Sequence, residues 1–342
     1  MKIYEVVIEP MSPFGTVLKG DTIFGHFCWQ AATDPTLLDG GLDRWLGQYT
    51  SRPFAIFSSA WPVLPCENGH EYALSRPPIL PGEIGSGDAV SRKQKMERRK
   101  MEKKRKWLLV SQDLRVELKS ERMRSDLECF HACLGHAPRD TVRSLRGLSR
   151  QNRKLILSAA QPHNSINRLT MTTGTGPFAP FSHENHHYMP GLKLAIFVGA
   201  DEEAVSVESL LAGLERIGSW GYGRDASAGL GKFIVHSVEE RTWPTITDRE
   251  KGCLTLGPVV PEKNTFLVCY GTPFTRFGRH GASLACSRHP FKKPVLMADD
   301  SSIMIPRDRA VFHKPYIGMA VQNISAADPR TVMQGYSLYL PC

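Results

Sequence analysis

A glycine-rich stretch between a helix pattern and a strand pattern most constrains how this 342-residue chain can fold. Five glycines lie between Gly218 and Gly231, together with Tyr222 and Arg224. Glycine lets the backbone adopt positive φ and approach a ligand closely, and successive outward N–H groups can form an anion-binding concavity. The stretch therefore predicts a loop that joins a helix to a strand and offers donors to an anion.

Two common phosphate-binding motifs do not match this stretch. A Walker A loop ends in Gly-Lys followed by Ser or Thr, but here Phe233 follows Lys232, and Ala226 stands where the first glycine should be. Ala226 also takes the third glycine position of the dinucleotide fingerprint, which joins a strand to a following helix. A flexible surface loop without a ligand stays open as the alternative.

Composition indicates a folded chain of about two domains, with 41% hydrophobic and 23% charged residues. No apolar run approaches the ~20 residues of a membrane span, and the first ten residues favour a strand over a signal peptide. We therefore expect a cytoplasmic protein without membrane contact, and no residue pattern implies a cofactor.

The positive charge is concentrated in one segment. The net charge is +9, and Arg92 to Lys106 holds ten basic and two acidic side chains, which leaves 33 basic and 32 acidic residues elsewhere. The segment is helix-prone and ends beside Trp107. Two readings stay open: a solvated linker helix, or a helix that faces phosphates without reading sequence.

The eight cysteines are scattered, which favours reduced thiols over a disulfide framework. Cys129, Cys133 and His136 would share one face of a helix and could offer three zinc ligands. No further pair completes the set, so we assign no metal and leave this cluster open.

Hydrophobic periodicity predicts the order of elements in the first part of the chain. The expected strands and helices cover about 2–9, a helix capped by Asp21 or Thr22 through about Thr33, 54–57, 192–198, 205–217 and 232–238. This β-α-β, insertion, β-α-β order predicts an α+β, ferredoxin-like (RRM-type) βαββαβ fold, in which the glycine loop joins the second helix to the last strand.

Domain boundaries follow from the same patterns. Residues 1–240 form the ferredoxin-like domain, with an insertion at 66–187 that is expected to be helical at 107–134. Short strands with Gly and Pro predict a second, β-rich domain at 241–342, whose order is compatible with a degenerate ferredoxin-like copy.

Three segments together resemble the RAMP superfamily of CRISPR effector proteins: the glycine loop, Leu18–Trp29 and Asn164–Thr170. Within that superfamily they are most similar to the type III-A (Csm) subunit that holds the 5′ handle of the crRNA. Tyr316–Gly318 and Gln334–Leu338 fit the end of such a subunit. The resemblance covers most of the chain outside 66–160.

The resemblance implies an RNA-binding subunit without nuclease activity. It would grip the crRNA 5′ tag beside a large polymerase/cyclase-like subunit and a backbone RAMP subunit. It would also reach the target RNA indirectly through a β-hairpin thumb that displaces a guide–target base pair. Here 164–190 is the candidate thumb, with Met171, Phe178 and Phe181 as wedges.

The predicted RNA-binding residues offer charge, backbone donors and flat side chains, the groups that single-stranded RNA requires. They are Lys19, Gly20, Asp21, Thr22, Asn167, Arg168, Thr170, Tyr222, Gly223, Arg224, Ser227, Gly229, Gly231 and Lys232. Trp220 and Tyr222 are the expected stacking groups. Asp21 could be only a helix cap, Asn167 and Arg168 only a polar loop, and Tyr270–His280 could form a further RNA-facing loop.

Two other functions stay open. A metal-independent endoribonuclease, as in RAMP proteins that process crRNA precursors, needs a general base, for which His26 is the candidate; His183, His186 and His187 form a second cluster. The equivalent subunit of another CRISPR subtype would share the glycine loop.

Overall fold

The computed structural model describes residues 1–67, 69–78, 96, 102, 104–248 and 250–342. Most of the basic segment 92–106 lies outside these residues, so its predicted helix is not described. Its last two residues, Arg105 and Lys106, begin a strand rather than end a helix.

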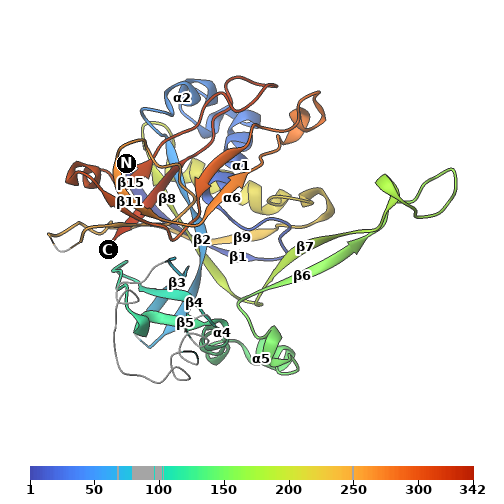
Figure 1. The fold of residues 1–342 in the computed structure, drawn as a ribbon, viewed down its shortest axis with the longest axis horizontal. Helices are drawn as coiled ribbons and strands as arrows, with labels where there is room; N and C mark the ends of the chain where they lie inside the picture. Colours follow the sequence, from blue (N-terminus) through green and yellow to red (C-terminus); the bar gives the residue numbers. More distant parts are fainter. Residues whose placement is uncertain (68, 79–95, 97–101, 103, 249) are drawn as a thin grey trace.

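An antiparallel seven-stranded sheet forms the centre of the fold, in the order β5-β4-β3-β2-β8-β1-β9 (Figure 1). Its strands are β1 Lys2–Pro10, β2 Ala55–Cys66, β3 Gly69–Ser75, β4 Arg105–Ser111, β5 Met123–Ser125, β8 Lys193–Ala200 and β9 Phe233–Glu240. Residues 194–200 of β8 are all buried, as expected for a central strand covered on both faces.

Four of these strands carry the predicted βαββαβ arrangement. They lie in the order β9-β1-β8-β2, and helices α1 (Gly20–Thr33) and α6 (Val207–Trp220) connect β1 to β2 and β8 to β9. Helix α1 buries Ile23, Phe24, Phe27 and Ala31, the apolar positions at helical spacing. The element order expected for this part of the chain is therefore confirmed.

The insertion differs from its expected helical character. Residues 105–111 form β4, which pairs with β3 and β5, and its Leu108, Leu109 and Val110 are buried in succession, so that both faces of the strand are covered. The remaining elements are η2 Ser120–Arg122, α4 Asp126–Gly135, α5 Arg139–Leu145 and η3 Arg150–Asn152. The prediction of a continuous helical segment at 107–134 was wrong for all but α4.

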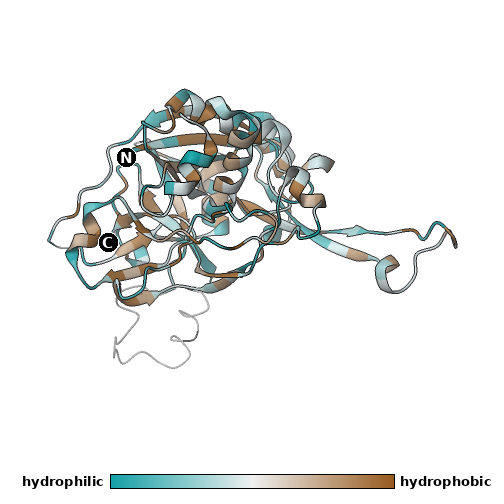
Figure 2. Ribbon diagram, turned by 90° about the horizontal axis from the view of Figure 1, so that it is seen from above, coloured by the Kyte–Doolittle hydropathy of each residue, from teal (hydrophilic) through white to brown (hydrophobic). Residues whose placement is uncertain are grey.

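A long hairpin projects from the body of the molecule (Figures 1 and 2). Strands β6 (Ile156–His163) and β7 (Phe181–Tyr188) pair antiparallel along their whole length, and a short helix η4 (Gly176–Phe178) lies in the loop that joins them. The predicted hairpin is present, but its first strand begins before residue 164, and 164–180 form its distal end.

The C-terminal part is β-rich, as expected. Its five-stranded sheet has the order β11-β14-β10-β16-β15, and β12 and β13 pair separately. The strands are β10 Cys253–Thr255, β11 Phe266–Tyr270, β12 Pro273–Arg276, β13 Val295–Ala298, β14 Ile303–Pro306, β15 Tyr316–Gly318 and β16 Tyr336–Pro341. Helices η6 (Ala282–Cys286) and η7 (Arg309–His313) are 3-10 turns. The described residues after 240 contain no α-helix, and a ferredoxin-like copy needs two, so this copy gains no support. The domain boundary at 240 stays a prediction.

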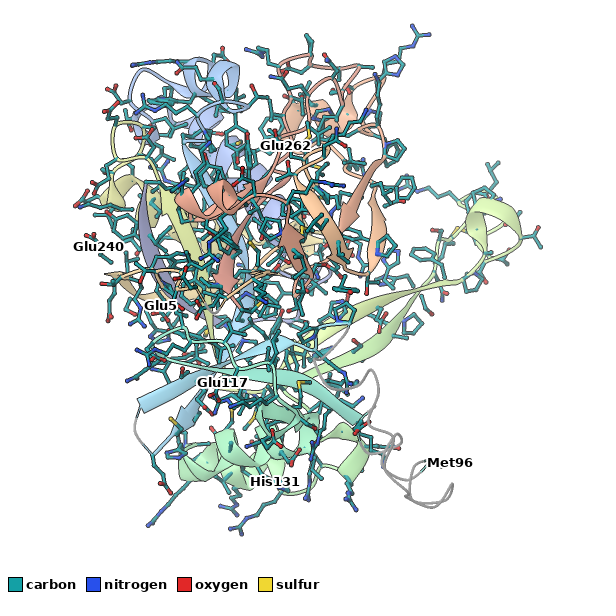
Figure 3. The ribbon with its side chains drawn as sticks, turned by 60° about the vertical axis from the view of Figure 1, so that its left-hand side comes forward. Glu5, Met96, Glu117, His131, Glu240 and Glu262 are labelled. Carbon is teal, nitrogen blue, oxygen red and sulfur yellow. The ribbon has the colours of Figure 1, made fainter. Side chains whose placement is uncertain are left out.

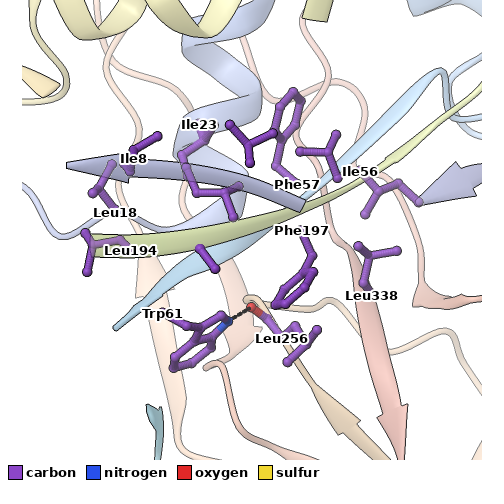
Figure 4. Packing of buried hydrophobic residues seen from close by; sticks show 14 of the residues in the cluster. Ile8, Leu18, Ile23, Ile56, Phe57, Trp61, Leu194, Phe197, Leu256 and Leu338 are labelled. Atoms are coloured by element: carbon purple, nitrogen blue, oxygen red, sulfur yellow. Dashed lines mark hydrogen bonds between the residues drawn. The ribbon is translucent and has the colours of Figure 1, made fainter. Parts of the chain in front are cut away.

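One core joins the two parts. Phe197, Leu256 and Leu338 lie in the same hydrophobic cluster as Ile8 and the α1 side chains, on the face of the sheet opposite α1 (Figure 4). Helix α2 (Leu42–Gln48), turn η1 (Pro35–Leu37) and turn η5 (Ala226–Ala228) complete the described helical elements. None of the helices in the described part is both long and apolar enough to cross a membrane.

A bulge in β2 holds these parts together. The register of β2 against β8 shifts between Phe57 and Ala60, which frees backbone groups for other partners. The buried amide of Gln334 accepts from the Phe57 N–H at 2.9 Å and donates to the Phe57 carbonyl at 2.7 Å. The Ser59 N–H donates to the Leu256 carbonyl at 2.8 Å.

We predict that Gln334→Met lowers the free energy of unfolding by about 2–6 kcal/mol, because each of the two buried Phe57 groups loses its partner at about 1–3 kcal/mol. Chemical denaturation measures this loss. Gln48→Met, at an exposed position of α2, is the matched control. Equal losses of stability in the two variants would show that the Gln334–Phe57 hydrogen bonds do not stabilise the fold.

Candidate nucleic-acid interface

Tyr222 fixes the glycine loop to the body of the protein. Its side chain is fully buried. The phenol donates to the Val17 carbonyl at 3.0 Å and accepts from the Lys19 N–H at 3.1 Å. Burial raises the pKa of Tyr222 well above its usual value. A ring in this position cannot stack on a base, so the stacking role expected for Tyr222 was wrong.

Two glycines of the loop serve its own packing. Gly223 has φ 77°, and a Cβ there would lie 2.6 Å from Thr16. Gly231 has φ 74°, and a Cβ there would lie 2.1 Å from the Tyr222 carbonyl oxygen. Gly229 also has positive φ, but its surroundings are open. The open side of the loop is therefore the side on which a ligand can approach.

Arg224 joins the loop to the base of the hairpin. Its backbone N–H donates to Thr16 Oγ1 at 3.0 Å, and its Nη2 donates to the Glu184 carbonyl at 2.8 Å and to Asn185 Oδ1 at 2.9 Å. Its Nε lies 3.1 Å from Asp225 Oδ2. The guanidinium thus holds β7 against the loop and shares its charge with Asp225.

Backbone bonds complete this connection. Phe14 and His186 exchange two N–H···O bonds of 2.9 Å, and the Gly231 N–H donates to the Pro13 carbonyl at 2.8 Å. We call residues 11–19, 184–186 and 220–232 the loop–hairpin junction. It brings the β1–α1 connection, the hairpin base and the glycine loop together. The sequence motifs alone did not predict this contact.

The Lys19 side chain faces the C-terminal part. Its Nζ lies 2.6 Å from Asp299 Oδ1 and 2.7 Å from Asp300 Oδ2. Burial alone would lower the pKa of Lys19, but the two carboxylates raise it overall. The ammonium is therefore already neutralised within the protein, which argues against the charge contribution expected of Lys19, and RNA contact there stays a prediction.

The two residues after Lys19 are also structural. Gly20 allows α1 to approach β2, since a Cβ there would lie 2.1 Å from the Phe57 carbonyl oxygen. The carboxylate of Asp21 binds Arg276 Nε at 2.6 Å. Asp21 makes no side-chain cap bond, and Lys19 is the N-cap residue of α1, so the expected Asp21 cap was wrong. Thr22 is half-buried, and RNA contact there stays a prediction.

Asn167, Arg168 and Thr170 lie at the distal end of the hairpin, away from the glycine loop (Figure 1). Asn167 shapes this end, because its Oδ1 accepts from the Leu169 N–H at 2.9 Å. Arg168 is exposed, and Thr170 Oγ1 lies 3.0 Å from Thr172 Oγ1. The three predicted motifs therefore occupy two separate places.

Leu169, the most exposed apolar side chain at the distal end of the hairpin, was not singled out from the sequence. Leu169 is 95% exposed, and its place with Ile166 and Met171 among polar residues is the signal that could have indicated it. Of the expected wedges, Met171 and Phe181 are exposed and Phe178 is half-buried.

The accessible face of the glycine loop is small. Trp220 is 61% exposed, and Ser227 and Lys232 are also exposed. Lys232 makes no ion pair with any residue that the structure describes, while its N–H donates to Ser12 Oγ at 2.9 Å. This face offers one indole, one cation and the open backbone around Gly229.

Two of the candidate histidines, His26 and His186, have partners within the protein. Nε2 of His26 accepts from the Gly223 N–H at 3.0 Å. Burial and, less strongly, the charge of Lys292 lower the pKa of His26 to about 4. His186 Nδ1 lies 3.0 Å from Ser158 Oγ, and burial lowers its pKa.

Metal binding gains no support. Within the described ranges, no group of three or more His, Cys, Asp or Glu side chains is placed to hold a metal ion. Cys129 is buried in α4, and burial raises its thiol pKa to about 12. A thiol in this state is a poor metal ligand because the thiolate is the ligand form.

Two pockets lie elsewhere. One, of about 430 Å³, lies against Phe266, Tyr316 and Tyr336, and the other, of about 620 Å³, lies between α1 and Lys292. None of the predicted RNA-binding residues lines either pocket. The expected RNA-facing loop 270–280 exposes Phe277, but its RNA contact stays a prediction.

We predict that His26→Phe destabilises the protein by about 1–3 kcal/mol at pH 7, because the Gly223 N–H loses its acceptor. Unfolded histidine titrates near 6.5, and folded His26 near 4. The contribution of neutral His26 is therefore complete above about pH 6.5 and is lost as the pH falls toward 4.

The difference between wild type and His26→Phe should accordingly shrink as the pH falls, measured by urea denaturation at each pH. His131→Phe is the control, because His131 is exposed on α4 at the surface of the insertion (Figure 3). A difference that stays constant from pH 7 to 4.5 would contradict the assignment.

No protein-family model and no curated protein matches the sequence. The structure is similar to a chain of the "Csm1-Csm4 cassette in complex with pppApA", with TM-score 0.51 and 15% identity over 100% of this chain and 97% of that chain. It is also similar to a chain of the "Csm3-Csm4 subcomplex in the type III-A CRISPR-Cas interference complex", with TM-score 0.51 and 13% identity over 100% and 99%. At these identities the similarity establishes a shared fold alone, an α+β arrangement with several antiparallel sheets.

Proposed function

We propose that this chain is the non-catalytic RNA-binding subunit of a type III CRISPR effector complex, of the type III-A (Csm) form. It would grip the crRNA 5′ tag and connect a large polymerase/cyclase-like subunit to a backbone RAMP subunit. The observation that carries the proposal is the full-length fold similarity to chains of two complexes whose common component is Csm4.

The loop–hairpin junction supports an RNA-binding role. Its outer face presents Trp220, Ser227 and Lys232 beside open backbone, and these groups suit one or two nucleotides of a single strand. Because Lys19, Asp21 and Arg224 are already paired within the protein, recognition would depend on the shape of the loop and few charges.

The hairpin would reach the target RNA. Leu169 and Met171 at its end are exposed and apolar, as a wedge between base pairs requires. The basic segment 92–106 could add a phosphate contact, and this stays a prediction because most of it lies outside the described residues.

We predict that Lys232→Ala reduces the salt dependence of binding to a single-stranded RNA of the CRISPR repeat, lowering the slope of log K against log[salt] by about 0.7 for the lost phosphate contact. Fluorescence anisotropy at several salt concentrations measures the slope. Lys263→Ala, at another exposed lysine, should leave it unchanged. The same slope in wild type and Lys232→Ala would remove Lys232 from the interface.

The endoribonuclease is the second candidate function, and the position of His26 argues against it. A general base needs a free lone pair within reach of a 2′-hydroxyl, whereas Nε2 of His26 accepts from the Gly223 N–H. We predict no site-specific cleavage of repeat RNA by the purified chain in EDTA. Cleavage that His26→Ala abolishes would overturn the non-catalytic assignment.

The equivalent subunit of another CRISPR subtype would share this fold and this loop. Co-purification of the chain with its neighbouring large subunit, identified by mass spectrometry, separates the subtypes. Recovery of a large subunit of another type would correct the type III-A assignment and leave the RNA-binding role intact.

A further inference from the structure

Three rings meet on one face of the projecting hairpin. Antiparallel pairing sets His163 opposite Phe181 and Gln161 opposite His183, and alternate residues along each strand share a face. The rings of His163 and Phe181 stack with centroids 5.3 Å apart and an interplanar angle of 11°. The His183 ring lies 5.2 Å from His163 and 5.0 Å from Phe181.

These rings do not belong to the core of the protein. Phe181 is 43% exposed, and none of the three residues is in a buried hydrophobic cluster. Phe181 is exposed and His163 and His183 are half-buried, so part of the ring surface is open to a ligand. A cluster of this kind is a stacking surface rather than a packing element.

A polar path on the same face connects the rings to the glycine loop. Asn185 Nδ2 donates to Gln161 Oε1 at 2.6 Å, and Asn185 Oδ1 accepts from Arg224 at 2.9 Å. His183 Nδ1 lies 3.7 Å from Asp225 Oδ2. We call Gln161, His163, Phe181, His183 and Asn185 the hairpin face; it runs continuously from the loop–hairpin junction toward the distal end.

We propose that the hairpin face binds an unpaired nucleobase of the single-stranded RNA that lies on the glycine loop, with Phe181 and His163 as the stacking surface. This inference rests on the proposed RNA-binding function and adds a binding position to it. Flat rings next to an amide and a guanidinium suit a heterocycle with a polar edge. Gln161 is exposed beside the rings, and its amide can hydrogen-bond the polar edge of a base, whereas an apolar protein segment offers no such partner.

The position is distinct from the distal end of the hairpin. The exposed apolar side chains at that end, Leu169 and Met171, can separate bases but have no ring, and the ring of Phe178 there is half-buried. The hairpin face instead lies along the paired strands, next to Arg224 and Asp225, where a strand leaving the loop would first meet the hairpin.

The test uses the full chain and a set of single-stranded RNA oligonucleotides of the CRISPR repeat, each with 2-aminopurine at one position. Stacking on an aromatic ring quenches 2-aminopurine fluorescence, so one position should be strongly quenched. Phe181→Leu should relieve that quenching and weaken binding about five- to 150-fold, the equivalent of one stacked base. Phe181→Trp should retain the quenching.

Leu267→Ala, at an exposed position of β11, is the control and should leave the quenched position unchanged, and thermal unfolding of each variant checks its folding. RNA binding by wild type with quenching that Phe181→Leu does not relieve would overturn this inference and leave the proposed function standing. Absence of RNA binding by wild type would overturn the proposed function itself. Loss of partner-subunit assembly in Phe181→Leu, with quenching intact, would reassign the face to protein binding.

Discussion

The buried phenol of Tyr222 is the interaction on which the candidate interface depends. One hydroxyl donates to the Val17 carbonyl and accepts from the Lys19 N–H, so it ties the end of α6 to the start of α1. Because the ring fills the interior, the loop must turn around it, and Gly223 and Gly231 provide the positive φ that this turn needs. The packing of the loop around Tyr222 therefore determines which of its groups are exposed on the outer face.

Charge in this region is used mainly inside the protein. Lys19 with Asp299 and Asp300, and Asp21 with Arg276, join the start of α1 to the C-terminal part. Arg224 joins the loop to β7. Ion pairs of this kind are costly to break once buried, so the junction is expected to bind as a preformed surface, with Trp220 and Lys232 as its accessible groups.

Sequence patterns predicted the fold well where the buried face of an element can be recognised from its own apolar residues. The apolar spacing of α1, α6 and β8 gave their positions and the βαββαβ order. The strand at Leu108–Val110 was missed because a basic run precedes it and because three successive buried residues lack the alternation that distinguishes a strand from a helix. Side-chain roles at Lys19, Asp21 and Tyr222 were missed for a different reason: their partners lie about 200 to 280 residues away, and no local spacing signals such pairs.

The most direct measurement is a crosslink map of 4-thiouridine-substituted crRNA on this chain within the assembled effector complex, read by mass spectrometry. We expect crosslinked peptides from 219–232 and from β6 or β7, the two sides of the loop–hairpin junction. Crosslinks confined to the C-terminal strands or to the surface of α4, with the junction unlabelled, would show that the RNA follows another path and that the glycine loop has only a structural role.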